Sequence, residues 1–311
     1  MHRRALGLLV GSIALVVALA ACGSDDDASS DSSATSEPST GSVDTTAPDD
    51  TTAPEDTVVD MTLVPATTVP VPEVALPSAT PTELVVTELE PGEGPPAAAG
   101  DSVFVHYVGV RSEDGAEFDS NYGGQPFPVV LGAGGVIEGW DQGLVGATAG
   151  ARLQLDIPAD LAYGDAPPNT DVIQPGDALS FVIDVLAVVP PADAADAPTA
   201  EEFPLSEELV TEAVSEDLVV GDGATLETGQ TGVFQLIAAR GDTGEVLEST
   251  WTSGQPQAFV IAEGQLLEGL VEGLPGMQVG GRRAITIPSD PNMGLTPETN
   301  VVIIADLLAT F

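Results

Sequence analysis

The feature that most constrains how this chain can fold is an internal repeat. The sequence matches itself at an offset of 129 and then 130 residues over about seventy positions. Many of the matched residues are glycines, which mark places where a backbone needs a positive φ angle or a close approach. We therefore expect two copies of one domain, at residues 83–189 and 206–311, joined by a Pro-, Ala- and acid-rich linker at residues 190–205.

Hydrophobic periodicity predicts a small α+β domain in the first copy. Residues 103–108 form a β-rich run, and apolar residues alternate along residues 153–157 and 179–185, as in half-buried antiparallel strands. Between these runs Ile137, Trp140 and Leu144 recur at the spacing of one face of a short helix. One helix packed on a small antiparallel sheet places each copy in the α+β class.

The N-terminus has the layout of a secretory leader. Two arginines precede an uncharged, mostly apolar stretch at residues 5–21, and Cys22 follows it. As a helix this stretch would span roughly 25 Å, which is short of a hydrocarbon core of about 30 Å. Leu19 to Cys22 resemble a bacterial lipobox, so residues 1–21 are expected to be a lipoprotein signal peptide and Cys22 the lipidated anchor in the cell membrane. An uncleaved anchor or ordinary secretion are the alternatives.

Residues 22–82 are expected to be an extracytoplasmic tether. They consist mainly of Ser, Thr, Asp, Pro and Ala, and no aromatic residue precedes Phe104. Such a composition cannot bury enough apolar surface to offset chain entropy. A cation-binding or cell-wall-binding role is the alternative to a solvated spacer.

Composition excludes several classes of function. The chain has 7 basic and 49 acidic residues and a formal charge of −42, which argues against a nucleic-acid partner. All seven basic residues are arginine, Cys22 is the single cysteine, and His106 is the only histidine beyond position 2. Catalysis by a lysine amine, a disulfide framework and a histidine-rich metal centre are therefore not expected, and neither is a cofactor.

Five ordered motifs in the first copy resemble one known family. They are Val105-His106-Tyr107-Val108-Gly109, Phe118-Asp119-Ser120, Pro126-Phe127, Val136-Ile137-Glu138-Gly139-Trp140 and Ala162-Tyr163-Gly164. Together they resemble the FKBP-type peptidyl-prolyl cis-trans isomerases. The resemblance covers essentially all of the first copy and implies about five antiparallel strands curled around one short helix. It also implies an activity, the isomerisation of X-Pro bonds in polypeptides.

The resemblance implies a prolyl pocket and assigns its residues. The residues implied in catalysis are Tyr107, Asp119, Trp140, Tyr163 and Phe181. The residues implied in substrate binding are Phe118, Phe127, Val136, Ile137 and Ile173. Tyr163 would donate a hydrogen bond to a substrate carbonyl, Tyr107 and Asp119 would lie at the pocket mouth, and the backbone N–H of Ile137 would hold a flanking carbonyl. His106 alternates with Tyr107 along a strand and is therefore expected to face away from the pocket.

The residue types suit that chemistry. Aromatic side chains offer broad, rigid apolar surface for a prolyl ring. Rotation about X-Pro faces a barrier of roughly 18–20 kcal/mol because amide resonance is lost midway. Since water stabilises the polar planar amide, a dry site favours the twisted one without a nucleophile or metal. A non-catalytic extracytoplasmic chaperone or peptide-binding module, or a cell-envelope scaffold, are the competing hypotheses.

The second copy lacks the aromatic residues. At the positions of Tyr107, Phe118, Phe127, Trp140, Tyr163 and Phe181 it has Leu236, Leu247, Gln257, Leu270, Met293 and Ile303. Glu248 replaces Asp119, and the loop before the last strand is eight residues shorter. The second copy is therefore expected to be a degenerate, non-catalytic FKBP-like domain. The paired Arg111, Arg152, Arg240 and Arg282 are expected to form ion pairs of the scaffold.

Overall fold

A computed structural model describes residues 70–168, 171–289, 295 and 298–311. The signal peptide, Cys22 and most of the expected tether lie outside the described residues. None of the described helices is long and apolar enough to cross a membrane.

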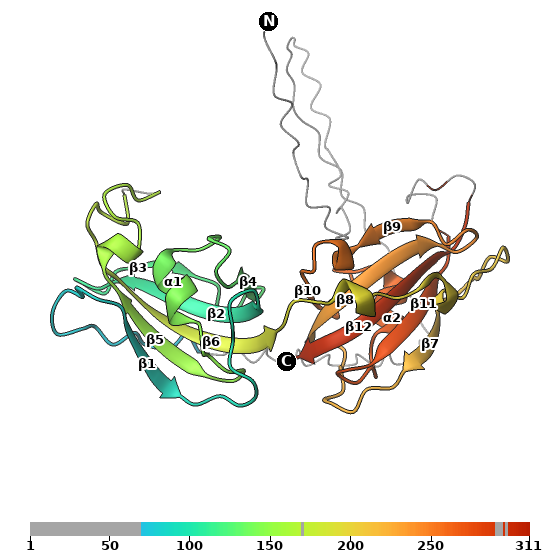
Figure 1. Cartoon of the computed structure of the whole chain (residues 1–311), viewed down its shortest axis with the longest axis horizontal. Coiled ribbons are helices and arrows are strands. Elements are labelled where there is room, and N and C mark those ends of the chain that lie inside the picture. Colours follow the sequence, from blue (N-terminus) through green and yellow to red (C-terminus); the bar gives the residue numbers. More distant parts are fainter. Residues whose placement is uncertain (1–69, 169–170, 290–294, 296–297) are drawn as a thin grey trace, which may run out of the picture. The chain divides into compact units, whose positions relative to one another are not determined.

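The first domain is one antiparallel sheet with a short helix on its inner face (Figure 1). Its elements are β1 (Val85–Glu90), β2 (Ser102–Arg111), β3 (Glu117–Ser120), β4 (Phe127–Val130), α1 (Glu138–Gly143), β5 (Arg152–Ile157) and β6 (Leu179–Val189). The strands run in the order β1-β5-β6-β2-β3, and β4 also pairs with β2. The sheet thus has six strands, one more than the five that the resemblance implies.

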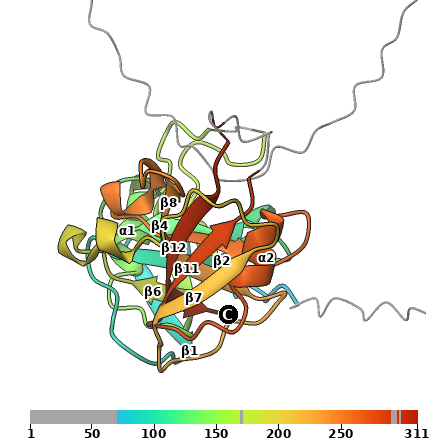
Figure 2. The same ribbon diagram turned by 90° about the vertical axis from the view of Figure 1, so that its right-hand side faces the viewer.

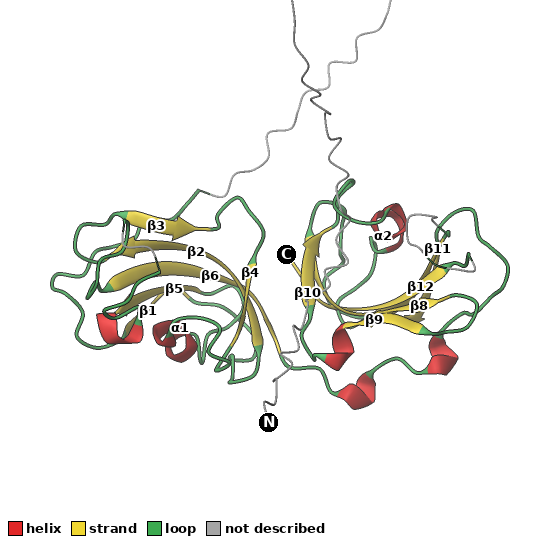
Figure 3. Ribbon diagram, turned by 90° about the horizontal axis from the view of Figure 1, so that it is seen from above, coloured by secondary structure: helices red, strands yellow, loops and turns green. Residues whose placement is uncertain are grey.

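The second domain repeats this arrangement, as Figures 2 and 3 show for its sheet and helix. Its elements are β7 (Val214–Val219), β8 (Thr231–Arg240), β9 (Val246–Ser249), β10 (Gln257–Val260), α2 (Glu268–Gly273), β11 (Arg282–Ile287) and β12 (Val301–Thr310). β7, β11, β12 and β8 lie side by side, and both β9 and β10 pair with β8. The α+β class predicted from periodicity is confirmed for both copies.

The strand register is also the same in the two domains. In the first, Tyr107 pairs with Ile183 across β2 and β6. In the second, Leu236 pairs with Ala305 across β8 and β12. Because side chains alternate between the faces of a strand, this shared register places equivalent residues on the same face.

The core of the first domain lies between the sheet and α1. Leu153, Leu155 and Ile157 of β5 point into it, together with Trp140 and Leu144 from the helix region. Ile137 and Leu144 cap α1 at its two ends, so the predicted apolar helix face extends one residue beyond each end of the helix. This core is the floor on which the candidate site is built.

The predicted scaffold ion pairs are present in both domains. Arg152 binds both carboxylate oxygens of Asp184, at 2.5 and 2.8 Å, and the equivalent Arg282 binds both oxygens of Asp306, at 2.6 and 2.7 Å. Burial acts to raise the pKa of Asp184, but hydrogen bonds from Arg152 and Tyr122 outweigh it and lower that pKa.

A lead-in segment precedes the first strand of each domain: residues 70–84 in the first and residues 199–213 in the second. The backbone N–H of Ala75 donates to the side-chain oxygen of Gln154 in β5 at 3.3 Å, and the Gln154 amide donates to the Ala75 carbonyl at 2.7 Å. A Cβ placed on Gly115 would lie 3.3 Å from Leu76 Cδ1, and one on Gly244 would lie 3.2 Å from Leu205 Cδ1. Both lead-in segments therefore lie against the domain that follows them.

Candidate active site

An aromatic cluster forms at the start of α1 in the first domain. The Trp140 ring lies 5.0 Å from the Tyr107 ring, 5.2 Å from Phe181 and 6.3 Å from Phe127, each in an edge-to-face arrangement. Phe118 meets Phe181 edge to face at 5.5 Å. Edge-to-face contacts set the positive edge of one ring against the negative face of another, which fixes the rings relative to each other.

The cluster has a buried floor and an exposed rim. Trp140 is 3% exposed, Phe181 4% and Ile173 5%, whereas Phe127 is 39% exposed and Tyr163 36%. Val136 and Ile137 are partly buried against the same core. The result is an apolar surface that opens to solvent through aromatic side chains.

Polar groups lie at the mouth of the cluster. The Tyr107 hydroxyl donates a 2.6 Å hydrogen bond to Asp119 Oδ2. Burial, together with that carboxylate, raises the pKa of Tyr107 well above its usual value. Burial and the charge of Asp119 also raise the pKa of Tyr163, so both tyrosines remain protonated donors at physiological pH.

The backbone N–H of Ile137 is free for a ligand. Ile137 is the N-cap of α1, and its own carbonyl accepts from Trp140 and Asp141. Among the described residues no hydrogen bond is donated by its N–H. A substrate carbonyl could therefore bind there without displacing a protein acceptor.

Asn121 positions Tyr107, a role that sequence reasoning missed. Its side-chain oxygen accepts from the Tyr107 N–H at 2.7 Å, and its amide donates to Val105 and Gln125 carbonyls at 3.0 Å. Thr250 stands at the equivalent position and accepts from the Leu236 N–H at 2.8 Å. Both domains thus use a polar side chain to hold the central strand at the site.

Gly109 is a second residue that the sequence did not single out. A Cβ on Gly109 would lie 2.7 Å from Phe118 Cζ and 2.7 Å from Phe181 Cε1. The equivalent residue of the second domain is Ala238, beside Ile303 instead of a phenylalanine. The missing Cβ therefore makes room for the two rings, and the glycine-to-alanine difference between the copies was the available signal.

His106 lies on the other side of the sheet, as the alternation of β2 predicts. Its ring centroid is 5.5 Å from that of Tyr122, whose hydroxyl donates to Asp184 at 2.8 Å. His106 is therefore separate from the aromatic cluster.

The position in the second domain that corresponds to the aromatic cluster is almost fully buried from solvent. Leu236, Leu270 and Ile303 are 6%, 1% and 0% exposed. A cavity of about 10 Å³ remains there, bordered by Glu248 and Gln257 among others. Burial raises the pKa of Glu248. Met293 lies outside the described residues.

An antiparallel sheet closed by one short helix, with an aromatic cluster where the helix begins, defines a class of small α+β domains that can hold an apolar ring. Comparison with known families agrees with this class. The FKBP_C family, FKBP-type peptidyl-prolyl cis-trans isomerase, matches residues 94–186 and 223–302, which is more than half of the chain. The chain therefore belongs to the FKBP-type peptidyl-prolyl cis-trans isomerases.

Individual relatives cover different shares of the chain. It is 49% identical over 109 residues to an FK506-binding protein of Streptomyces anulatus, covering 35% of this chain and 88% of that protein. It is 33% identical over 208 residues to human peptidyl-prolyl cis-trans isomerase FKBP10, covering 66% of this chain and 32% of that protein. The crystal structure of FkpA from Escherichia coli matches 38% of this chain and 52% of its own, at 38% identity and a TM-score of 0.32.

Proposed function

We propose that the first domain catalyses cis/trans isomerisation of X-Pro bonds in polypeptides, with the prolyl ring bound against Trp140. The observation that carries this proposal is the aromatic cluster, whose floor is almost fully buried while Phe127 and Tyr163 at its rim are exposed. An apolar ring fits such a surface, and rigid aromatic walls lose little rotamer entropy on binding.

The site acts by favouring the twisted amide. In the twisted state the C–N bond has lost its double-bond character and the carbonyl carries less charge. Exclusion of water therefore costs the twisted amide less free energy than it costs the planar amide. The Ile137 N–H holds a flanking carbonyl of the substrate, and the Tyr163 hydroxyl donates to the carbonyl of the bond that rotates. Contacts formed better in the twisted state than in the planar one lower the barrier.

Asp119 acts by positioning Tyr107. The two share a 2.6 Å hydrogen bond, which fixes the Tyr107 ring against Trp140. Residues 120–125 contain no basic residue that could pair with this carboxylate. The hydrogen bond to Tyr107 therefore also orients the Asp119 carboxylate, so that each side chain holds the other in place.

The second domain is proposed to be non-catalytic. At its equivalent position Leu236, Leu270 and Ile303 are almost fully buried, and the cavity bordered by Leu236, Ile303 and Glu248 measures about 10 Å³, room for at most about one water molecule. At the six positions equivalent to the aromatic cluster and Tyr163, no aromatic side chain remains for a prolyl ring to pack against. Catalysis by the chain is thus assigned to the first domain.

The full chain is expected to accelerate exchange between the cis and trans forms of a short X-Pro peptide, measured by NMR exchange spectroscopy. It should also accelerate proline-limited refolding of a model protein, a step that takes tens of seconds when uncatalysed. Absence of acceleration at an excess of the chain over peptide would contradict the assignment.

We further propose that the protein works outside the cytoplasm on a lipid anchor at Cys22 and a tether within residues 22–82, the last part of which, from Ala75 on, lies against the first domain. The leader-like residues 1–21 and the lipobox-like Leu19 to Cys22 support this. Two or more acyl chains hold a protein firmly, whereas one binds only marginally. Mass spectrometry of the mature N-terminal peptide should show acyl additions on Cys22, and Cys22→Ser should abolish them. An intact Met1 in the membrane fraction would point to an uncleaved anchor.

A further inference from the structure

The second domain has an open pocket that lies beside its closed prolyl position and includes Leu267, the counterpart of Ile137. This pocket has a volume of about 380 Å³ and lies between α2, the end of β11 and the residues that lead into β7. It shares no lining residue with the small cavity at Leu236 and Ile303. Its volume falls at the lower end of the range for ligand pockets, roughly 300–1,000 Å³.

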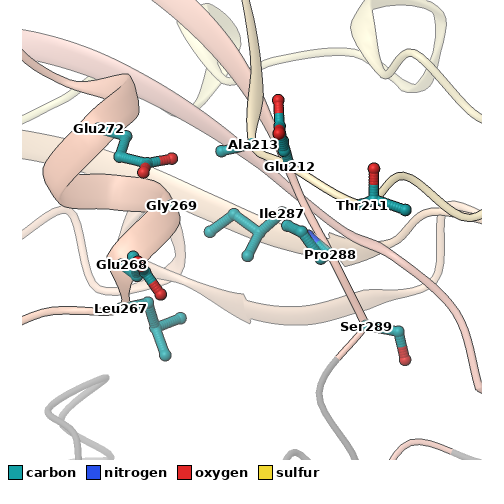
Figure 4. A pocket seen from close by; sticks show the side chains of 10 residues that line it. All are labelled: Thr211, Glu212, Ala213, Leu267, Glu268, Gly269, Glu272, Ile287, Pro288 and Ser289. Atoms are coloured by element: carbon teal, nitrogen blue, oxygen red, sulfur yellow. The ribbon is translucent and has the colours of Figure 1, made fainter.

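The pocket combines an apolar floor with an acidic rim. Ile287 and Pro288 lie between helix α2 on one side and residues 211–213 on the other (Figure 4). Glu268 and Glu272 stand on α2, and Glu212 lies on the opposite side (Figure 4). We call these ten lining residues the acidic pocket: Thr211, Glu212, Ala213, Leu267, Glu268, Gly269, Glu272, Ile287, Pro288 and Ser289.

The first domain differs at four of the ten positions of the acidic pocket, and two of these differences change its size or its charge. Leu84 stands where the second domain has Ala213, and its side chain packs against the first core. Gln142 stands where the second domain has Glu272, and its amide donates to Glu138 at 2.9 Å. The second domain therefore has a smaller side chain in the pocket and one more negative charge on its rim.

Nothing basic lines the acidic pocket. The three arginines of the second domain bind other carboxylates: Arg240 binds Asp242, Arg282 binds Asp306 and Arg283 binds Asp217. The described residues contain no cluster of carboxylates close enough to hold a metal ion. The charge is thus spread around the rim of a hollow whose floor is apolar, and it is not focused on one point.

A long cationic side chain matches this distribution. Lysine and arginine have an apolar stem and a charged head, so the stem can cover Ile287 and Pro288 while the head reaches the glutamates. We propose that the acidic pocket binds a lysine or arginine side chain of a polypeptide. The second domain would then hold a client through a basic residue, independently of any proline.

The test uses the full chain and a five-residue peptide with a central lysine between two leucines and no proline. Methyl NMR signals of Leu267 and Ile287 should shift on titration, and binding should weaken as salt rises from about 0.05 to 0.5 M. Ala213→Leu restores the first domain's residue and keeps the charge, and it should weaken binding by about tenfold or more. Glu272→Gln should weaken binding by about two- to fivefold, as expected for an exposed ion pair.

Two matched controls separate the acidic pocket from general attraction to an acidic protein. Glu216→Gln on exposed β7 removes the same charge away from the pocket and should leave binding unchanged. A peptide with glutamate in place of lysine should not shift the pocket methyl signals. The proposal is overturned if Ala213→Leu, shown to be folded by an unchanged melting temperature, binds as well as the natural chain. It is also overturned if Glu216→Gln weakens binding as much as Glu272→Gln.

Discussion

The two domains share a backbone fold but differ in the side chains that pack between the sheet and the helix. Strand order and register agree between them, and the bidentate Arg152–Asp184 pair recurs as Arg282–Asp306. In the first domain the space over the helix holds aromatic rings, while in the second the equivalent Leu270 and Ile303 pack as ordinary core. The comparison teaches that the fold depends on the sheet framework, whereas the candidate site depends on a few large side chains.

The framework also adjusts to those side chains. Gly109 leaves space for Phe118 and Phe181, and Ala238 takes up the equivalent space where the neighbouring residues are aliphatic. A pocket of this kind therefore needs both its rings and the absence of a Cβ beneath them.

The largest effect is expected from giving the first domain the second domain's residues. Phe127→Gln, Trp140→Leu and Phe181→Ile together remove most of the aromatic contacts, each worth about 0.5–1.5 kcal/mol. A loss of about 3 kcal/mol lowers kcat/KM by roughly 100-fold. Activity of the triple variant is measured on an X-Pro peptide, and its folding by circular dichroism. Substantial remaining activity would mean that the second domain also catalyses.

Gly109→Ala is expected to have the next largest effect. The new methyl group would press on two rings, and overpacking typically costs about 1–3 kcal/mol. We expect kcat/KM to fall by about tenfold. The matched control is Ala238→Gly, which should leave activity unchanged. Equal activity of Gly109→Ala and the natural chain would show that the ring positions are not critical.

Tyr163→Phe should have a smaller effect, because it removes one hydrogen bond worth about 1 kcal/mol. This predicts a loss of about fivefold in kcat/KM with little change in melting temperature. Tyr122→Phe is the control, since its hydroxyl binds Asp184 on the other face of the sheet. A larger loss in Tyr122→Phe than in Tyr163→Phe would contradict the proposed carbonyl contact.

The smallest effect concerns pH. The pKa of Asp184 is lowered in the folded chain, so its contribution to stability is complete above the ordinary aspartate value of about 4 and is lost as the pH falls through the lowered pKa. Melting curves between about pH 6 and pH 3 should show a smaller decline for Asp184→Asn than for the natural chain. An identical decline would mean that the ion pair adds no pH-dependent stability.

Much of the fold could be predicted from the sequence because its signals are local. Alternation along residues 153–157 and 179–185 and the helical spacing of Ile137, Trp140 and Leu144 correspond to β5, β6 and the α1 region. The repeat offset predicts that the second copy follows the same path, and the register confirms it.

The remaining features depend on contacts between distant segments. Phe118 and Phe181 belong to β3 and β6, on opposite sides of β2, so their shared need for Gly109 is visible only in three dimensions. The acidic pocket depends on the loss of one side chain, Leu84 in the first copy and Ala213 in the second. Such a change leaves the apolar pattern intact and gives no signal of its own.

The assignment of Tyr163 and the other site residues to substrate contacts stays a prediction.

The lead-in segments bear on how the number of domains in such a chain can change. Leu76 lies over Gly115 as Leu205 lies over Gly244, and both pairs are separated by the same 129-residue offset. The repeat therefore includes the lead-in segment, so that the residues that enter the second domain correspond to the residues that enter the first. A further duplication of this stretch would add a third domain together with its own lead-in segment. The number of domains could then change without any new linker having to evolve.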